Sequence, residues 1–323
     1  MEPRNPHGRH QDRVALPVVW RVAVLHHGSP SSLALAGLRE GLRRRGLIHG
    51  VNCVVNAAGA EGRLAQLPML VERLLQRGPD VMVAMGAVAA LSAQRATSRV
   101  PILHAIVLDA SDIGLTARNV SGVSTFDPDQ ATRHLRLLQQ LVPGLRTVAF
   151  LTDVDAPRAL DGRNPLATQL LWAAAALRLD TTCVALSGID ANLEDAFNSV
   201  QQARAQALVA LEVPAVLARL GDIVRLAECH RLPTLTPYGW PDTGVVMQGA
   251  ALYDAIDPLA EYVVALSCSA CVADVPLRTV RHERVVIHRG RAQRIGLRVP
   301  ACVLDQVTQF IDDKPSDDAK AGY

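Results

Sequence analysis

The stretch from Trp20 to Gly50 constrains the fold of this chain more than any other part of the sequence. An apolar run at 22–25 is typical of a strand that is buried on both faces. A polar turn at 26–32 follows, and leucines then recur at helical spacing until Gly46 ends the helix. A second apolar run begins at Val51. The pattern predicts a strand–helix–strand unit whose first turn lies at the carboxyl end of a strand, where open α/β sheets bind ligands.

The same unit repeats along the chain, because short apolar runs alternate with amphipathic segments of helical length. This alternation predicts an α/β fold with parallel sheets and right-handed crossovers. A length of 323 residues, 49% of them hydrophobic, is enough for two cores, so we expect two domains. The end of the chain differs: we predict a strand–turn–strand hairpin over 283–295 and a helix over 300–311.

Composition excludes two classes of partner. The net charge is only +2, and nucleic-acid binders usually carry a clear basic excess, so we expect no nucleic acid. No run approaches the roughly 20 apolar residues that a membrane span needs, so we expect no stable membrane insertion. Residues 1–19 are rich in Pro, Gly, His and Arg and are expected to be disordered. They contain neither an apolar core region nor a small-residue cleavage site, so we expect no secretory leader in this chain.

Small and polar residues follow the predicted strands and often precede helices. Such turns expose backbone N–H groups, and the helix dipole favours an anionic group there. A small molecule with a carboxylate would fit, although Ser and Gly at these positions could also simply cap helices. The predicted ligand-binding residues are Ser29, Pro30, Gly86, Ala87, Asp109, Asp153, Glu212 and Tyr238. Tyr238 and Trp240 stand out because aromatic residues make up only 3% of the chain, and they would form either a stacking wall or ordinary loop packing.

Motifs for catalysis and for cofactors do not occur in the sequence. It contains no GxGxxG, no GxxxxGK[ST] and no GxSxG, so we expect no enzyme and no cofactor. His26 and His27 are adjacent on a predicted strand and should point to opposite faces, which favours a structural or pocket-lining role over metal binding. Cys268 and Cys271 form a single CxxC at the end of a helix. A structural role is favoured for this pair, with a disulfide or a metal site as alternatives.

Several stretches, in this order and spacing, resemble the periplasmic substrate-binding components of ABC transporters, in the uncharacterised or aromatic-amino-acid group. The resemblance spans about residues 20–311. The stretches are 41–52, 60–62 with 67–68, 86–90 with 96–97, 100–109, 119–123, 138–144, 230–233, 273–276 and 295–297 with Pro300. The chain departs from the family pattern at three places. A Thr-Pro is replaced by Ala87-Val88, an Asp-Pro by Asp109-Ala110, and a "KG.KP" motif by the segment that contains the CxxC.

The resemblance implies a type I periplasmic binding protein fold, with two Rossmann-like lobes joined by a hinge and one ligand in the cleft between them. The lobes would comprise 20–125 with about 249–280, and 126–248 with about 281–311, followed by a polar tail at 312–323. It implies a small organic ligand, carboxylate-bearing or aromatic, an ABC transporter permease as partner and a periplasmic location, or a cytoplasmic one if no leader is encoded. Ser29 would face residues after position 150 across the cleft. The alternative is a cytosolic sensor or effector-binding domain of the same fold.

Overall fold

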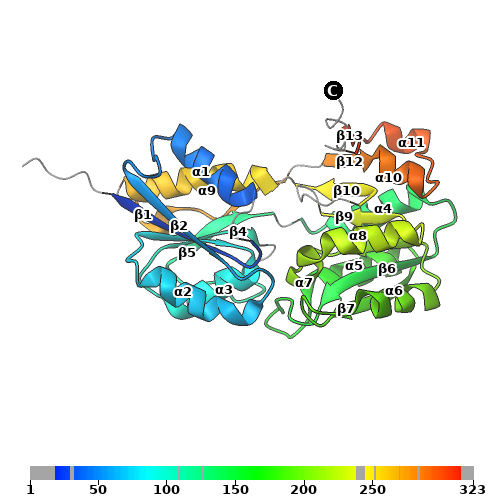
Figure 1. Cartoon of the computed structure of the whole chain (residues 1–323), viewed down its shortest axis with the longest axis horizontal. Coiled ribbons are helices and arrows are strands. Elements are labelled where there is room, and N and C mark those ends of the chain that lie inside the picture. The colour runs from blue at the N-terminus through cyan, green and yellow to red at the C-terminus, as the bar shows by residue number, and fades with distance from the viewer. Residues whose placement is uncertain are drawn as a thin grey trace, which may run out of the picture.

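The structure is a computed structural model that describes residues 19–29, 33–107, 110–125, 127–237, 244–250, 252–268, 270–281 and 284–313. The chain forms two α/β lobes, each built on its own sheet (Figure 1). The segment expected to be disordered and the polar tail fall almost entirely outside these residues. The predicted two-lobe α/β fold with mainly parallel sheets is confirmed.

The first lobe contains a six-stranded sheet in the order β11-β5-β4-β3-β1-β2, and all of its strand pairs are parallel. Its strands are β1 (Trp20–His26), β2 (Cys53–Gly59), β3 (Val81–Met85), β4 (Ile102–Val107), β5 (Val120–Ser124) and β11 (Arg278–Thr279). Its helices are α1 (Leu33–Arg44), α2 (Leu67–Leu75), α3 (Ala87–Ala96) and α9 (Leu252–Ser267), with short 3-10 turns η1 (Leu64–Gln66) and η2 (Val272–Asp274). Helices α1 and α9 cover one face of the sheet, and α2 and α3 cover the other (Figure 1).

Strand β1 shows why this sheet is buried on both faces. Val22 and Val24 belong to the apolar cluster beneath α1 and α9, whereas Ala23 and Leu25 belong to the cluster beneath α2 and α3. Alternate side chains of a strand point to opposite faces, so both helix layers are held by the same strand. Complete burial of a Val or Leu side chain contributes about 1.5–3 kcal/mol. The predicted burial of this strand on both faces is confirmed.

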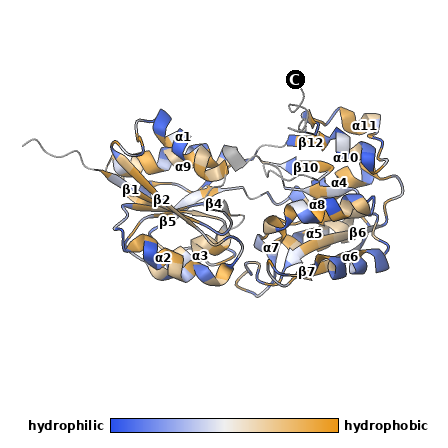
Figure 2. Cartoon of the chain, viewed as in Figure 1, coloured by the Kyte–Doolittle hydropathy of each residue, from blue (hydrophilic) through white to orange (hydrophobic). Residues whose placement is uncertain are grey.

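The second lobe contains a seven-stranded sheet in the order β13-β12-β10-β9-β8-β6-β7. Its strands are β6 (Thr147–Asp153), β7 (Asp180–Leu186), β8 (Ala207–Ala210), β9 (Thr234–Thr236), β10 (Val246–Gly249), β12 (Arg284–His288) and β13 (Gln309–Ile311). Its helices are α4 (Gln130–Leu141), α5 (Pro165–Ala176), α6 (Leu193–Gln202), α7 (Pro214–Ala218), α8 (Leu220–Cys229), α10 (Arg289–Arg294) and α11 (Ala301–Leu304). Its core is one apolar cluster in which Phe150 and Phe197 are almost fully buried. In both lobes several strands are largely apolar, whereas the outward faces of several helices are hydrophilic (Figure 2).

The two sheets repeat one topology. The orders β2-β1-β3-β4-β5 and β7-β6-β8-β9-β10 are the same doubly wound arrangement. In such sheets the order reverses beside the first strand, and ligands bind outside the carboxyl ends of the strands at that point. The chain passes between the lobes three times, from β5 to α4, from β10 to α9 and from β11 to β12. The fold therefore places the ends of β1 and β3 in one lobe, and of β6 and β8 in the other, as the expected binding positions.

The hairpin predicted over 283–295 is wrong, because β12 runs directly into helix α10. The Nδ1 atom of His288 accepts a hydrogen bond from the backbone N–H of Arg291 at 3.3 Å and so caps the helix. Arg291 and Arg294 on this helix both pair with Glu228 of α8, so tertiary contacts favour the helix. Strand β12 instead pairs antiparallel with β10 and parallel with β13.

The helix predicted over 300–311 is largely wrong as well. Only Ala301–Leu304 is helical, and 309–311 is the edge strand β13. The backbone N–H of Thr308 donates to the carbonyl of Val285 at 2.8 Å, which aligns the following residues beside β12. A short apolar run can form either a helix or a strand. Here pairing with the open edge of the sheet makes residues 309–311 a strand. Cys268 and Cys271 follow α9 as exposed free thiols.

Candidate functional site

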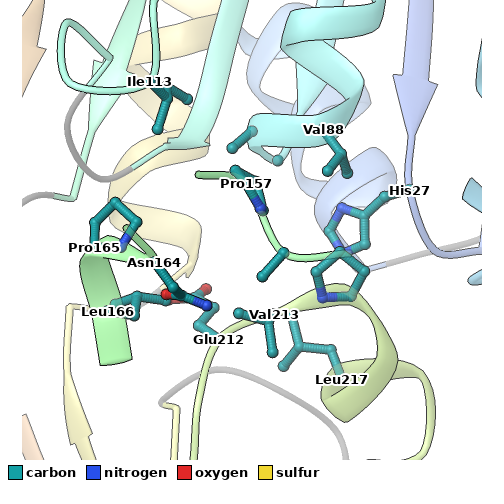
Figure 3. A pocket seen from close by; sticks show the side chains of 14 residues that line it. His27, Val88, Ile113, Pro157, Asn164, Pro165, Leu166, Glu212, Val213 and Leu217 are labelled. Atoms are coloured by element: carbon teal, nitrogen blue, oxygen red, sulfur yellow. The ribbon is translucent and has the colours of Figure 1, made fainter. Parts of the chain in front are cut away.

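A cavity of about 650 Å³, counting its opening to solvent, lies between the two lobes (Figure 3). The first lobe contributes residues that follow β1, β3 and β4, namely His27, Gly86, Ala87, Val88 and Ile113. The second lobe contributes Ala156 and Pro157 after β6, Asn164 to Leu166 at the start of α5, and Glu212 to Pro214 with Leu217 after β8. The wall thus comes from the strand ends where the topology places a ligand site. Most lining side chains are apolar, and Glu212 is the only acidic one among the described lining residues.

Gly86 and His27 form one side of the first-lobe wall. Gly86 has φ +94° and ψ 152°, a region that is essentially restricted to glycine. A Cβ atom on Gly86 would lie 2.4 Å from Nδ1 of His27, so the ring also requires a glycine there. Nδ1 of His27 lies 3.1 Å from the carbonyl oxygen of Met85, and a carbonyl can only accept, so Nδ1 carries the hydrogen. Burial lowers the pKa of His27, and the neutral ring keeps Nε2 as an acceptor.

The rings of His26 and His27 stack, with centroids 4.8 Å apart and an interplanar angle of 24°. The prediction that they point to opposite faces is therefore wrong. Strand β1 ends at His26, and the backbone N–H of Gly28 donates to Nδ1 of His26 at 2.6 Å, so a turn brings the rings together. Burial lowers the pKa of His26 to about 3, so this ring is neutral too. Among the described residues, no group of three His, Cys, Asp or Glu side chains is placed to hold a metal ion.

The two helices that begin at the cavity differ in how their first turns are capped. Helix α3 begins after Gly86, which has no side chain to cap it, so its first backbone N–H groups have no partner from a cap. Helix α5 is capped by Asn164, whose Oδ1 accepts from the backbone N–H of Ala167 at 3.2 Å. Nδ2 of Asn164 donates to Oγ1 of Thr152 at 3.1 Å. Helix α3 therefore presents the end better suited to an anionic group.

Asp153 lies behind the cavity wall and not on it. Its carboxylate is buried and accepts hydrogen bonds from the backbone N–H groups of Ala215 at 2.8 Å and Asp155 at 2.9 Å. Burial is the main cause that raises the pKa of this carboxyl. Asp153 thus ties the first turn of α7 and the loop after β6 to the end of its strand. Both segments carry lining residues, so Asp153 shapes the site indirectly.

The structure brings Gly86, Ala87 and Glu212 together in one cavity wall. Ser29 is exposed and is not among the described residues that line the cavity. Pro30, Asp109, Tyr238 and Trp240 lie outside the described residues. Asn164 was missed, although an Asn followed by Pro165 is a helix-start signature that could have indicated it. Val213 and Leu217 were missed because, in sequence, they are indistinguishable from core residues.

The lobes also touch beside the cavity. The backbone N–H of Leu160 in the second lobe donates to the carbonyl of Asp112 in the first lobe at 2.8 Å. Arg63 and Asp190 form an exposed ion pair at 3.7 Å across the same boundary. A Cβ on Gly62 would lie 2.9 Å from Cδ1 of Ile189, so the lobes are closely apposed there.

Residues 21–311 match the family described as ABC transporter substrate binding protein. Within the part of the chain that the structure describes, no helix has the length and apolar character to span a membrane. A search of curated proteins found no match.

Solved structures share the fold at low sequence identity. A conserved domain protein from Vibrio cholerae is 19% identical, with a TM-score of 0.80 over 91% of this chain and 100% of that one. The ABC domain in complex with L-Trp from Streptococcus pneumonia is 20% identical, with a TM-score of 0.77 over 90% of this chain and 100% of that one. The substrate-binding protein CD0873 from Clostridium difficile is 16% identical, with a TM-score of 0.62 over 92% of this chain and 100% of that one. The fold is that of the type I periplasmic binding proteins, as predicted. The chain belongs to the family of ABC transporter substrate-binding proteins.

Proposed function

We propose that this protein is the solute-binding component of an ABC-type importer and captures a small organic ligand, carboxylate-bearing or aromatic, in the cavity between its lobes. The observation that carries the proposal is the cavity itself, which both lobes line at the ends of β1, β3, β6 and β8.

The lining supports this class of ligand. The first turn of α3, at Ala87 and Val88, offers backbone N–H groups and a positive dipole end to a carboxylate. Val213 and Leu217 supply apolar surface for an aromatic or aliphatic body. Glu212 lies on the second-lobe side of the cavity, where it could meet an amino group (Figure 3). The L-Trp complex of the similar Streptococcus protein makes an aromatic amino acid the first compound to test.

We infer that the ligand is held by closure of the lobes about the three connecting segments. The lobes would be 20–125 with about 249–280, and 126–248 with about 281–311, as the sequence suggests. Hinge closure of this kind is a common way in which two-domain binding proteins enclose a ligand. The partner would be the permease of the transporter, and the site of action would be outside the cytoplasm, as is typical of the family.

Thermal unfolding with added compounds tests the proposal. L-tryptophan, L-leucine and phenylacetate should be screened, because a ligand that binds only the folded state stabilises it by RT ln(1 + [L]/Kd), about 2.7 kcal/mol at 100 times Kd. The variant Ala87→Trp fills the cavity from its wall and should abolish the shift in Tm. Ala96→Trp places the same side chain at the exposed end of the same helix and should leave the shift unchanged. If compounds stabilise both variants equally, the ligand does not bind in this cavity.

A further inference from the structure

The ring of His27 presents one nitrogen atom to the cavity between the lobes. His27 directly follows β1 and lines the cavity, although only 5% of the residue is exposed. Its Nδ1 donates to the carbonyl of Met85 at 3.1 Å, which leaves Nε2 of the neutral ring without a hydrogen. None of the described residues donates to this Nε2, yet it is not sealed from solvent as Nε2 of His26 is. Nε2 of His27 is therefore an acceptor that opens into the cavity without a partner among the described residues.

Contacts on three sides hold this ring in one orientation. It stacks on the ring of His26, which is itself fixed by the 2.6 Å hydrogen bond from the backbone N–H of Gly28. It also packs so closely against Gly86 that a Cβ there would lie 2.4 Å from Nδ1. A ring turned over by half a rotation would lose the hydrogen bond to Met85. The acceptor is thus already in place before a ligand binds, which lowers the cost of binding.

The acceptor lies next to the place where a carboxylate is expected. Gly86 directly precedes α3, whose first turn at Ala87 and Val88 lines the same cavity. A carboxylate bound at this helix end would carry its neighbouring carbon past Gly86, beside the ring of His27 (Figure 3). A carboxylate oxygen cannot pair with Nε2, because both atoms are acceptors. The group that faces Nε2 must therefore be a donor attached close to the carboxylate.

We propose that Nε2 of His27 determines specificity by accepting a hydrogen bond from a donor on the carbon next to the carboxylate of the ligand. The protein would then bind α-hydroxy or α-amino acids in preference to carboxylic acids that lack such a group. The inference rests on the proposed function and narrows its ligand class. A hydroxyl and an ammonium share the required chemistry, and the probes below distinguish them.

Three probes that differ only at the α carbon test this. All carry a carboxylate and a phenyl ring, and 3-phenylpropanoate has no further group, L-phenyllactate adds a hydroxyl, and L-phenylalanine adds an ammonium. Titration calorimetry with the full chain should show at least one substituted probe binding at least about fivefold more tightly than 3-phenylpropanoate. A ligand without the donor leaves a buried acceptor unpaired, which lowers affinity by roughly this factor or more.

The variant His27→Phe keeps an aromatic ring, removes the acceptor and should abolish this advantage. His49→Phe is the matched control, since His49 is an exposed histidine of the same lobe and is not among the described residues that line the cavity. It should leave the ratio of affinities unchanged within about twofold. In ¹⁵N NMR of the histidine rings, the Nε2 signal that His27→Phe removes should move upfield when the preferred probe binds, but not with 3-phenylpropanoate.

The comparison of probes uses the unmodified protein, so it decides even if His27→Phe does not fold. Equal affinities of the three probes, or an advantage that survives in His27→Phe, would overturn the role of His27 alone. If none of the probes binds the unmodified protein, the ligand class of the proposed function fails, and the role of His27 fails with it.

Discussion

The substitution Gly86→Ala tests how the first-lobe wall is built. Gly86 lies between β3 and α3 and lines the cavity, and its backbone and its neighbour His27 both exclude a side chain. We expect Gly86→Ala to destabilise the protein strongly and to displace the ring of His27. The displacement would change the cavity wall, so it should also weaken binding of any ligand found there.

Three contributions make up the expected loss of stability. Holding Ala at φ +94° and ψ 152° costs about 1–3 kcal/mol. The new Cβ would lie 2.4 Å from Nδ1 and 2.9 Å from Cε1 of His27, and overpacking of a buried side chain costs about 1–3 kcal/mol. A shifted ring also loses its 3.1 Å hydrogen bond to Met85, worth about 0.5–1.5 kcal/mol. The sum is about 2.5–7.5 kcal/mol, a large part of the 5–15 kcal/mol that is typical of a folded domain.

Urea unfolding at equilibrium measures the loss, and Gly46→Ala is the matched control. Gly46 has φ +89° and nothing within 4 Å of a built Cβ, so only the backbone term applies, at about 1–2 kcal/mol. In a His27→Ala background the overpacking and hydrogen-bond terms vanish, so Gly86→Ala should cost about 1–3 kcal/mol there. A cost below about 1 kcal/mol in the unmodified protein, or the same cost in both backgrounds, would refute the reasoning.

Three further predictions concern stability. Burial lowers the pKa of His104 and His134 to about 4, so between pH 6.5 and pH 4 the unfolded chain binds more protons than the folded one. The free energy of unfolding should be highest above pH 6.5 and fall on acidification by up to about 1.4 kcal/mol per pH unit for each histidine. Urea midpoints at pH 7.5, 6 and 5 would show this decrease, and equal midpoints at the three pH values would contradict it. In the same assay Asp153→Ala should lower the free energy of unfolding by about 2–4 kcal/mol, because two backbone N–H groups lose their acceptor. A decrease below about 1 kcal/mol would mean that other groups replace the carboxylate as acceptor. Arg45, directly after α1, forms a half-exposed ion pair of 2.8 Å with Asp257 of α9, so Arg45→Ala should lower the free energy of unfolding by less than about 1 kcal/mol; a larger loss would show that this pair is more than surface pairing.

Much of the fold could be predicted because its elements are long and strongly periodic. The run at 22–25 and the leucine pattern that follows define β1 and α1 through local physics alone. The last segments could not be predicted in this way. His288 caps a helix whose arginines meet Glu228, and residues 309–311 pair with an open sheet edge, and both partners are distant in sequence.

The candidate site, too, could be predicted from the sequence only in part. That a small residue such as Gly86 or a polar one such as Glu212 follows a strand is visible in the sequence, and a parallel sheet carries such residues to its ligand-binding edge. Which of them reach the cavity depends on side-chain direction. Asp153 follows its strand in the same way, yet its carboxylate turns inward to two backbone N–H groups.

The sequence by itself determined the class of fold, the family and the sheet edges at which a ligand site was expected, because hydrophobic period, turn residues and motif order are local properties. Only the tertiary structure decided that His27 lies beside Gly86 and that Asn164 and Leu166 join Glu212 in one cavity wall. These features arise from contacts between segments far apart in the chain. No local pattern encodes such contacts, since each depends on how two independently formed surfaces meet.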